Sequence, residues 1–191
     1  MKRLLLIAVA TLTLSTALAC ESAPPSTAYR TSTVTVTQTP HNTEANDLLQ
    51  FAEEGSDLQY QMHMAFLDLI HVSSDVTYSK YSSASALRTE LTKISSWIVD
   101  NVESPLKWLY APASAVKTKS SLLEQYDILF RGSEYLYAAA ICLDTGDSAD
   151  AVRMGNAAFS ILNNEFRTSE KKNQQELIDL RLRAEKELGL R

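Results

Sequence analysis

Glycine and proline are scarce in this chain of 191 residues, which contains five of each. A β-sandwich or β-barrel needs many tight turns built from these residue types, so the composition favours long helices joined by few connections. Hydrophobic residues make up 45% of the chain and charged residues 21%, which is the balance of a chain that folds around a core. The length suits one domain with appendages.

Basic residues are also fewer than acidic ones, since the chain has 18 Lys and Arg residues and 23 Asp and Glu residues. A nucleic-acid-binding surface needs a basic face that displaces counterions from phosphates, so we expect no nucleic-acid partner. Residues 20–166 hold 9 basic and 18 acidic residues, a net charge of −9, whereas residues 167–191 hold 7 and 5, a net charge of +2. This asymmetry favours head-to-tail or partner contacts through the C-terminal segment, with a solvated helix end as the alternative.

The sequence lacks the motifs of common catalytic and cofactor sites. It has no Gly-rich phosphate loop, no nucleophile elbow and no HExxH pair. A diiron bundle needs two Glu-x-x-His pairs and a c-type haem needs Cys-x-x-Cys-His, and neither pattern is present. We therefore predict that the protein is not an enzyme and carries no cofactor.

The first 20 residues have the three parts of a secretory signal. Lys2 and Arg3 give a positive start, residues 4–14 are an apolar run, and small residues lead to Cys20. The uncharged segment 4–20 is 17 residues long and is diluted by three threonines and a serine. A permanent transmembrane helix is therefore the less favoured interpretation.

Residues 17–20 read ALAC, and here the chain resembles the bacterial lipoprotein family, whose lipobox places small or aliphatic residues before an obligatory cysteine. The resemblance implies that residues 1–19 are a signal peptide and that Cys20 becomes the first mature residue, acylated (for example with palmitate) on its sulfur and amino group. Several acyl chains together give stable membrane anchoring. The implied location is the extracytoplasmic side of the cell envelope, at the outer membrane of a Gram-negative source because Glu21 replaces aspartate. A secreted protein cut nearby is the alternative.

The segment 20–43 is rich in Ser, Thr and Pro and offers no large apolar face, so we predict that it is a tether. As a flexible coil it would span about 25 to 30 Å, enough to lift a domain off the headgroups. The alternating residues 33–37 leave a strand or glycosylated hydroxyls as alternatives. The folded domain would then comprise residues 44–191.

Apolar residues at helical spacing predict an all-α, up-down four-helix bundle with an extended C-terminal helix. The four predicted helices cover residues 44–78, 84–103 with a further turn at 104–109, 111–145, and 147 onwards. Ser82 or Ser83 would cap the second helix, and Gly146 would end the third. The stripe of the first helix repeats every seven residues in two interleaved series, which comprise Leu48, Gly55, Met62, Leu69 and Val76, and Phe51, Leu58, Ala65 and Val72.

Residues 167–176, RTSEKKNQQE, contain no apolar residue. Either the fourth helix continues in solvent past the end of the bundle, or it breaks and a small terminal helix docks separately. Glu and Lys keep helix propensity without tertiary contacts, so we predict a continuous helix. The apolar positions from Leu177 to Leu190 would then lie beyond the bundle and be free to bind a protein partner.

The region around Gly146 is similar to one tetratricopeptide repeat, a helix hairpin with small residues at its close-packing points. No second copy lies 34 residues away, so a solenoid is not expected, and a tight hairpin alone explains the match. Cys142 lies in an apolar stretch of the same region and is predicted to be a buried small hydrophobe. The positions that carry the similarity are Tyr135, Ala139, Gly146, Asp147, Ala151 and Ala158.

Three polar residues at helical spacing, Asp68, His71 and Asp75, share one face of the first helix. They suggest a metal site, and a solvated face is the alternative. His63 lies two turns away and has no carboxylate at helical spacing before it. A metal would therefore be held by the first three side chains.

Four aromatic residues around the second and third helices, Trp97, Trp108, Tyr110 and Tyr126, suggest a groove for a glycan, a lipid chain or a peptide. Core packing is the alternative interpretation of these side chains. Two functional hypotheses follow from the whole sequence. The first is a membrane-anchored lipoprotein whose bundle is an interaction or scaffold module, and the second is a bundle that binds a small ligand or a metal.

Overall fold

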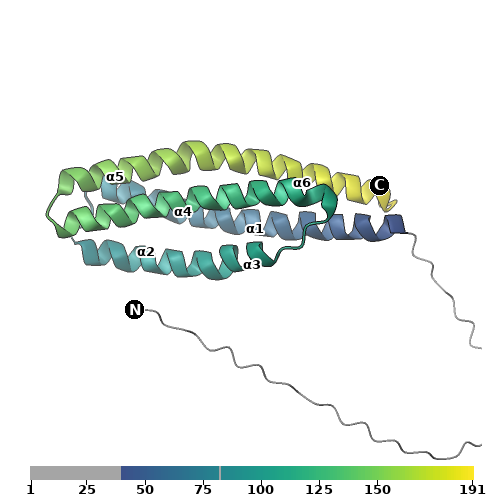
Figure 1. Cartoon of the computed structure of the whole chain (residues 1–191). Coiled ribbons are helices and arrows are strands. Elements are labelled where there is room, and N and C mark those ends of the chain that lie inside the picture. Colours follow the sequence, from purple (N-terminus) through teal and green to yellow (C-terminus); the bar gives the residue numbers. More distant parts are fainter. Residues whose placement is uncertain (1–39, 82) are drawn as a thin grey trace, which may run out of the picture. The chain divides into compact units, whose positions relative to one another are not determined.

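The computed structural model describes residues 40–81 and 83–191, which form four antiparallel helical rods (Figure 1). The predicted signal peptide, Cys20 and most of the predicted tether lie outside the described residues. No strand occurs in the part of the chain that is described. The rods are, in order, α1 (Pro40–Thr77); α2 (Ala84–Ile98), a π-helical turn (Val99–Glu103) and α3 (Ser104–Trp108); a 3₁₀ turn (Ala113–Ala115) and α4 (Val116–Asp144); and α5 (Ser148–Ser160), a π-helical turn (Ile161–Phe166) and α6 (Arg167–Glu187).

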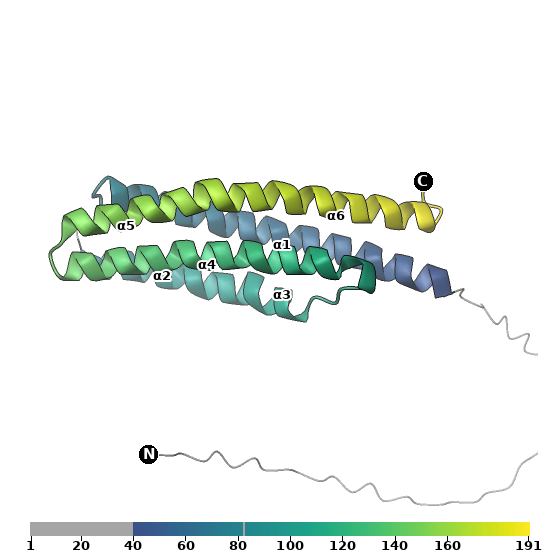
Figure 2. The same cartoon turned by 45° about the horizontal axis from the view of Figure 1, so that its top comes forward.

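The up-down arrangement places each rod beside the rod that follows it in sequence, and the last rod beside the first (Figures 1 and 2). α1 packs along both α5 and α6, and α4 packs against α2 and α5. The all-α fold predicted from the sequence is therefore confirmed. The second rod does not break near Glu103, where the sequence predicts a break, but continues through its π-helical turn. In this turn the Asn101 side-chain amide donates a hydrogen bond to the Trp97 carbonyl at 2.8 Å.

The core lies along the axis of the bundle, and every member of the two heptad series on α1 is buried. Leu69 is fully buried whereas Leu67, which belongs to neither series, is 42% exposed, so the predicted register is confirmed. The rings of Phe66 and Phe166 stack with centroids 4.9 Å apart and join the first rod to the fourth. Burial of one such side chain stabilises the fold by about 1.5 to 3 kcal/mol.

Two helical glycines mark places where rods approach closely. A Cβ atom on Gly55 of α1 would lie 2.7 Å from Cδ2 of Leu177 on α6. A Cβ atom on Gly132 of α4 would lie 2.7 Å from Cδ2 and 2.9 Å from Cγ of Leu162. Since real Cβ contacts are longer than this, the leucines occupy space that only glycine leaves open.

The start of α2 and the connection from α4 to α5 carry the caps that their sequences predict. The Ser83 hydroxyl accepts a hydrogen bond from the Ala86 N–H at 3.3 Å, and the Asp147 carboxylate accepts one from the Asp150 N–H at 2.9 Å. Gly146 has φ 78°, and the following N–H of Asp147 donates to the Cys142 carbonyl at 2.9 Å, which closes α4 in a Schellman motif. These short-range signals set the hairpin between α4 and α5.

The C-terminal helix is continuous through residues 167–176, as predicted, but it does not project beyond the bundle. α1 begins at Pro40 and is 38 residues long, so it runs beside α6 and packs against it. Leu177 and Ala184 of α6 are therefore buried, at 1% and 0% exposure. In the stretch without apolar residues, the inward position belongs to Asn173, which is fully buried. The prediction that the apolar side of residues 177–190 lies beyond the bundle is therefore wrong for its inward-facing residues.

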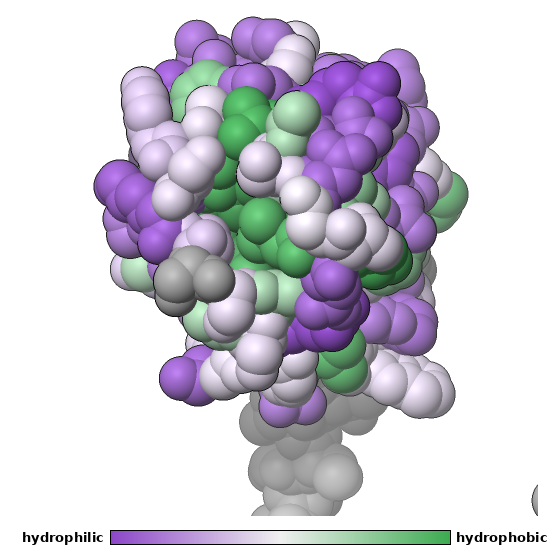
Figure 3. All heavy atoms as spheres, turned by 90° about the vertical axis from the view of Figure 1, so that its left-hand side faces the viewer, coloured by the Kyte–Doolittle hydropathy of each residue, from purple (hydrophilic) through white to green (hydrophobic). Residues whose placement is uncertain are grey.

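The end of the bundle that carries the α1–α2 and α4–α5 connections shows apolar residues at its centre and polar residues around its rim (Figure 3). The apolar stripes of the rods meet in the core, as in amphipathic helices, although some large apolar side chains such as Phe130 and Ile141 are exposed. Among the helices of residues 40–81 and 83–191, none combines the length and the apolar composition needed to cross a bilayer.

Candidate functional site

The residues predicted as a metal site are not assembled around one point. Asp75 Oδ1 accepts a hydrogen bond from Lys80 Nζ at 2.6 Å, whereas Nε2 of His71 lies 3.8 Å from the other oxygen of Asp75. Asp68 is exposed on the same helix. Within the described residues, no group of three or more His, Cys, Asp or Glu side chains is placed to hold a metal ion.

The four aromatic residues predicted to line a groove fall into two environments. Trp97 and Tyr126 are half-buried against the core, whereas Trp108 and Tyr110 are 87% and 67% exposed near the end of α3. Burial and a hydrogen bond from the Tyr126 hydroxyl to Glu103 Oε2 at 3.0 Å raise the pKa of Tyr126 to about 12. Tyr126 therefore links the third rod to the second through this hydrogen bond.

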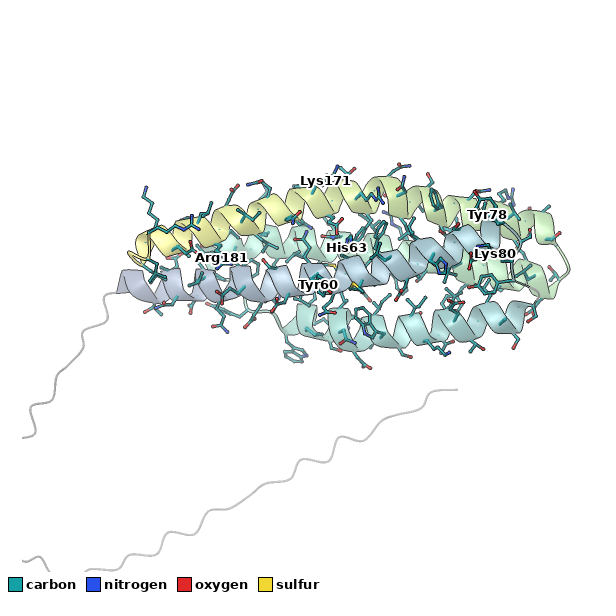
Figure 4. The ribbon with its side chains drawn as sticks, turned by 180° about the vertical axis from the view of Figure 1, so that it is seen from behind. Tyr60, His63, Tyr78, Lys80, Lys171 and Arg181 are labelled. Carbon is teal, nitrogen blue, oxygen red and sulfur yellow. The ribbon has the colours of Figure 1, made fainter. Side chains whose placement is uncertain are left out.

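A groove of about 420 Å³ runs along the surface between α1 and α6, a pairing that the sequence did not predict. Tyr60 and Ile178 stand at its two sides and are 61% and 45% exposed. Figure 4 shows Tyr60 and His63 on α1 beneath the basic helix α6. The groove is lined by Ser56, Gln59, Tyr60, His63, Glu170, Gln174 and Ile178.

A hydrogen-bond pair at one end of the groove joins the two helices. Nδ1 of His63 lies 2.7 Å from Glu170 Oε1, and the Gln59 side-chain amide donates to the Glu170 carbonyl at 2.7 Å. One turn further on, the Arg167 guanidinium lies 5.5 Å from the centroid of the Phe66 ring. The carboxylate partner of His63 is 107 residues away in sequence, so helical spacing around His63 did not reveal it.

The groove is lined by hydrogen-bonding groups and apolar surface. Its one aliphatic hydroxyl, on Ser56, donates to the Ala52 carbonyl at 2.7 Å. His63 in turn is paired with Glu170. What the groove presents is apolar surface on Tyr60 and Ile178 beside the amides of Gln59 and Gln174.

The two helices that form the groove differ in charge. α1 carries seven acidic residues and no Lys or Arg. α6 carries six Lys and Arg residues and five acidic residues. Lys171 and Arg181 are two of the basic side chains of α6, and both are exposed to solvent (Figure 4).

Comparison with known proteins gives no relative, since no family model, no curated protein and no solved structure matches the chain. The similarity to a tetratricopeptide repeat is local to the α4–α5 hairpin. Its small residues Ala139, Ala151 and Ala158 are buried where the two helices pack, which is the role that a tight hairpin requires of them.

Proposed function

We propose that this protein is a bacterial lipoprotein, anchored through Cys20, whose helical bundle is an extracytoplasmic protein-interaction module that binds its partner in the α1–α6 groove. The groove itself is the observation that supports the binding role. It is partly open to solvent, and its exposed apolar side chains, Tyr60 and Ile178, lie among amide and charged groups. A small ligand is normally enclosed by its pocket, so an open groove suits a macromolecular partner better.

The anchor is supported by the ALAC sequence at residues 17–20 and by the secretory features before it. Nineteen residues separate Cys20 from Pro40, where α1 begins, and a chain of that length reaches at most about 70 Å. An anchored bundle would stay near the membrane, where confinement raises its effective concentration towards other envelope proteins.

Cell fractionation of cysteine variants tests the anchor. The wild-type protein should remain with membranes after washing with high salt, whereas Cys20→Ser should be unprocessed or soluble. Cys142, on α4, is the only other cysteine and provides the matched control, because Cys142→Ala should fractionate like the wild type. A Cys20→Ser protein that is cleaved normally and still fractionates with membranes would contradict the lipoprotein proposal.

Photo-crosslinking in living cells tests the groove. Tyr60 in the groove and Tyr78 just beyond the end of α1 are both exposed, at 61% and 71%, so replacement by benzoylphenylalanine leaves the core intact at either position. We expect a protein adduct from position 60 and none from position 78. Equal adducts at both positions, or none at position 60, would rule out the groove as the binding surface.

A further inference from the structure

The outer surface of α1 and α6 has opposite charges on its two sides. Glu53 is exposed on the acidic helix α1, and Lys171 and Arg181, labelled in Figure 4, are exposed on the basic helix α6. The hydrogen bond from Arg181 to Glu185 is the main cause that raises the pKa of Arg181, and the charge of Glu53 raises this pKa further. Glu53 and Arg181 therefore lie at the same level along the helices. We name this surface the α1–α6 face and define it by Glu53, Tyr60, Leu67, Lys171, Ile178 and Arg181.

The middle of the α1–α6 face is apolar. Tyr60, Leu67 and Ile178 are 61%, 42% and 45% exposed. Tyr60 and Leu67 are seven residues apart on α1 and therefore point the same way. Tyr60 and Leu67 continue the row of Glu53 on α1. Ile178 lies between Lys171 and Arg181 along α6. Apolar side chains flanked by charged ones are the composition expected of a protein interface with a polar rim.

A surface that is acidic on one side and basic on the other is complementary to itself. A two-fold axis parallel to the helices would place α1 of one copy against α6 of the other, and the same contact would occur twice. A two-fold axis across the helices would instead place α1 on α1, where acidic side chains repel. Only the first arrangement pairs opposite charges on both sides.

We propose that the occupant of the α1–α6 face is a second copy of this chain, related by a two-fold axis parallel to the helices. The two α1 helices are then parallel, and both begin at the same end of the dimer. Because the chain towards Cys20 joins α1 at Pro40, both chains leave towards one membrane, which is what two lipid anchors need. This step rests on the proposed anchor, while the charge and apolar complementarity do not.

Charge reversal in differently tagged copies tests the dimer. Two tagged forms of the full chain are co-expressed, extracted from membranes in mild detergent and isolated through one tag. In the dimer, Glu53 of each copy faces Arg181 of the other, so Glu53→Arg in both copies should lower co-isolation about tenfold, because both ion pairs become repulsive. Arg181→Glu in both copies should do the same.

Co-expression of a Glu53→Arg copy with an Arg181→Glu copy should restore co-isolation, since both contacts again join opposite charges. Lys93→Glu, on the exposed side of α2, is the matched control and should have no effect. Equal co-isolation for all combinations, or no co-isolation of wild-type copies, would overturn the proposal. The amount of protein in the membrane fraction reports on the anchor separately. Soluble copies that still co-isolate would therefore refute the anchor and leave the dimer standing.

Discussion

Replacing two neighbouring residues of α6, Leu177 and Ile178, tests whether the C-terminal helix belongs to the core. Leu177 is 1% exposed and its Cδ2 atom lies over Gly55 of α1, whereas Ile178 is 45% exposed at the groove. Both are apolar, both lie on the same helical turn, and both lose a similar volume on replacement by alanine. The two variants therefore differ mainly in burial.

The expected cost of Leu177→Ala follows from the space that it leaves. Truncation of a buried leucine to alanine costs about 2 to 5 kcal/mol and costs more where the surroundings cannot collapse into the cavity. Gly55 has no side chain that can fill the space, so we expect a loss of about 3 to 5 kcal/mol. Ile178→Ala removes a half-exposed side chain and should cost about 1 kcal/mol or less.

Urea unfolding followed by circular dichroism measures both losses, and thermal unfolding checks them. For a domain of this size, about 1 kcal/mol shifts the midpoint by roughly 2 to 4 °C, so Leu177→Ala should lower it by about 6 to 20 °C. An unchanged m-value would show that the change is in stability. Equal shifts for Leu177→Ala and Ile178→Ala would refute the packing of α6 on α1 and restore the projecting helix that the sequence predicts.

Three further substitutions test particular contacts by the same unfolding measurements. Gly132→Ala should destabilise the fold by up to about 2 kcal/mol, because overpacking against Leu162 outweighs the gain of about 1 kcal/mol in helix propensity. In a Leu162→Ala background, Gly132→Ala should instead stabilise the fold. Ser79→Gly should stabilise by about 0.5 to 1 kcal/mol, since Ser79 has φ 55°, and Ser79→Ala should bring no gain. Asn173→Leu should cost about 1 to 3 kcal/mol by leaving buried Gln125 without its partner, and Gln125→Leu in the same chain should recover most of that loss.

The parts of the fold that the sequence predicted depend on residues close together in the chain. The heptad series of α1 reports which side of one helix is apolar, and burial of all its members follows from that alone. Gly146 and Asp147 act within one turn, through a positive φ and a side-chain cap. Such signals are complete before any tertiary contact forms.

The position of α6 could not be predicted in this way, because the residues that hold its polar stretch are not apolar. Asn173 donates to the Ser121 carbonyl at 3.1 Å and to Gln125 Oε1 at 2.7 Å, so a polar residue takes an inward position that hydropathy assigns to solvent. The space for Leu177 comes from Gly55, which the sequence shows only as the one member of the heptad series without an apolar side chain. Both contacts join residues far apart in the chain.

The candidate site was missed for the same reason. Tyr60 and His63 lie off the apolar stripe of α1, and only the arrival of α6 turns that side into a groove. The metal and aromatic sites predicted from the sequence relied instead on spacing within one or two helices. Spacing showed that Asp68, His71 and Asp75 share a face, but Asp75 is engaged by Lys80 from the turn that follows α1.

Under the proposed binding role, α6 has two surfaces with separate roles, and adjacent residues belong to different ones. Leu177 and Asn173 face inwards and hold the helix on the bundle, whereas Ile178 lines the groove and Arg181 is exposed to solvent, so that truncation of either would leave the core intact. Loss of stability should therefore follow the inward residues and loss of association the outward ones. Because Leu177 and Ile178 are consecutive, a defect in association at Ile178 without a change in the unfolding midpoint cannot arise from displacement of the helix. The polar stretch 167–176 fits both roles, since its single buried amide holds the helix while its basic side chains remain exposed, as the proposed association requires.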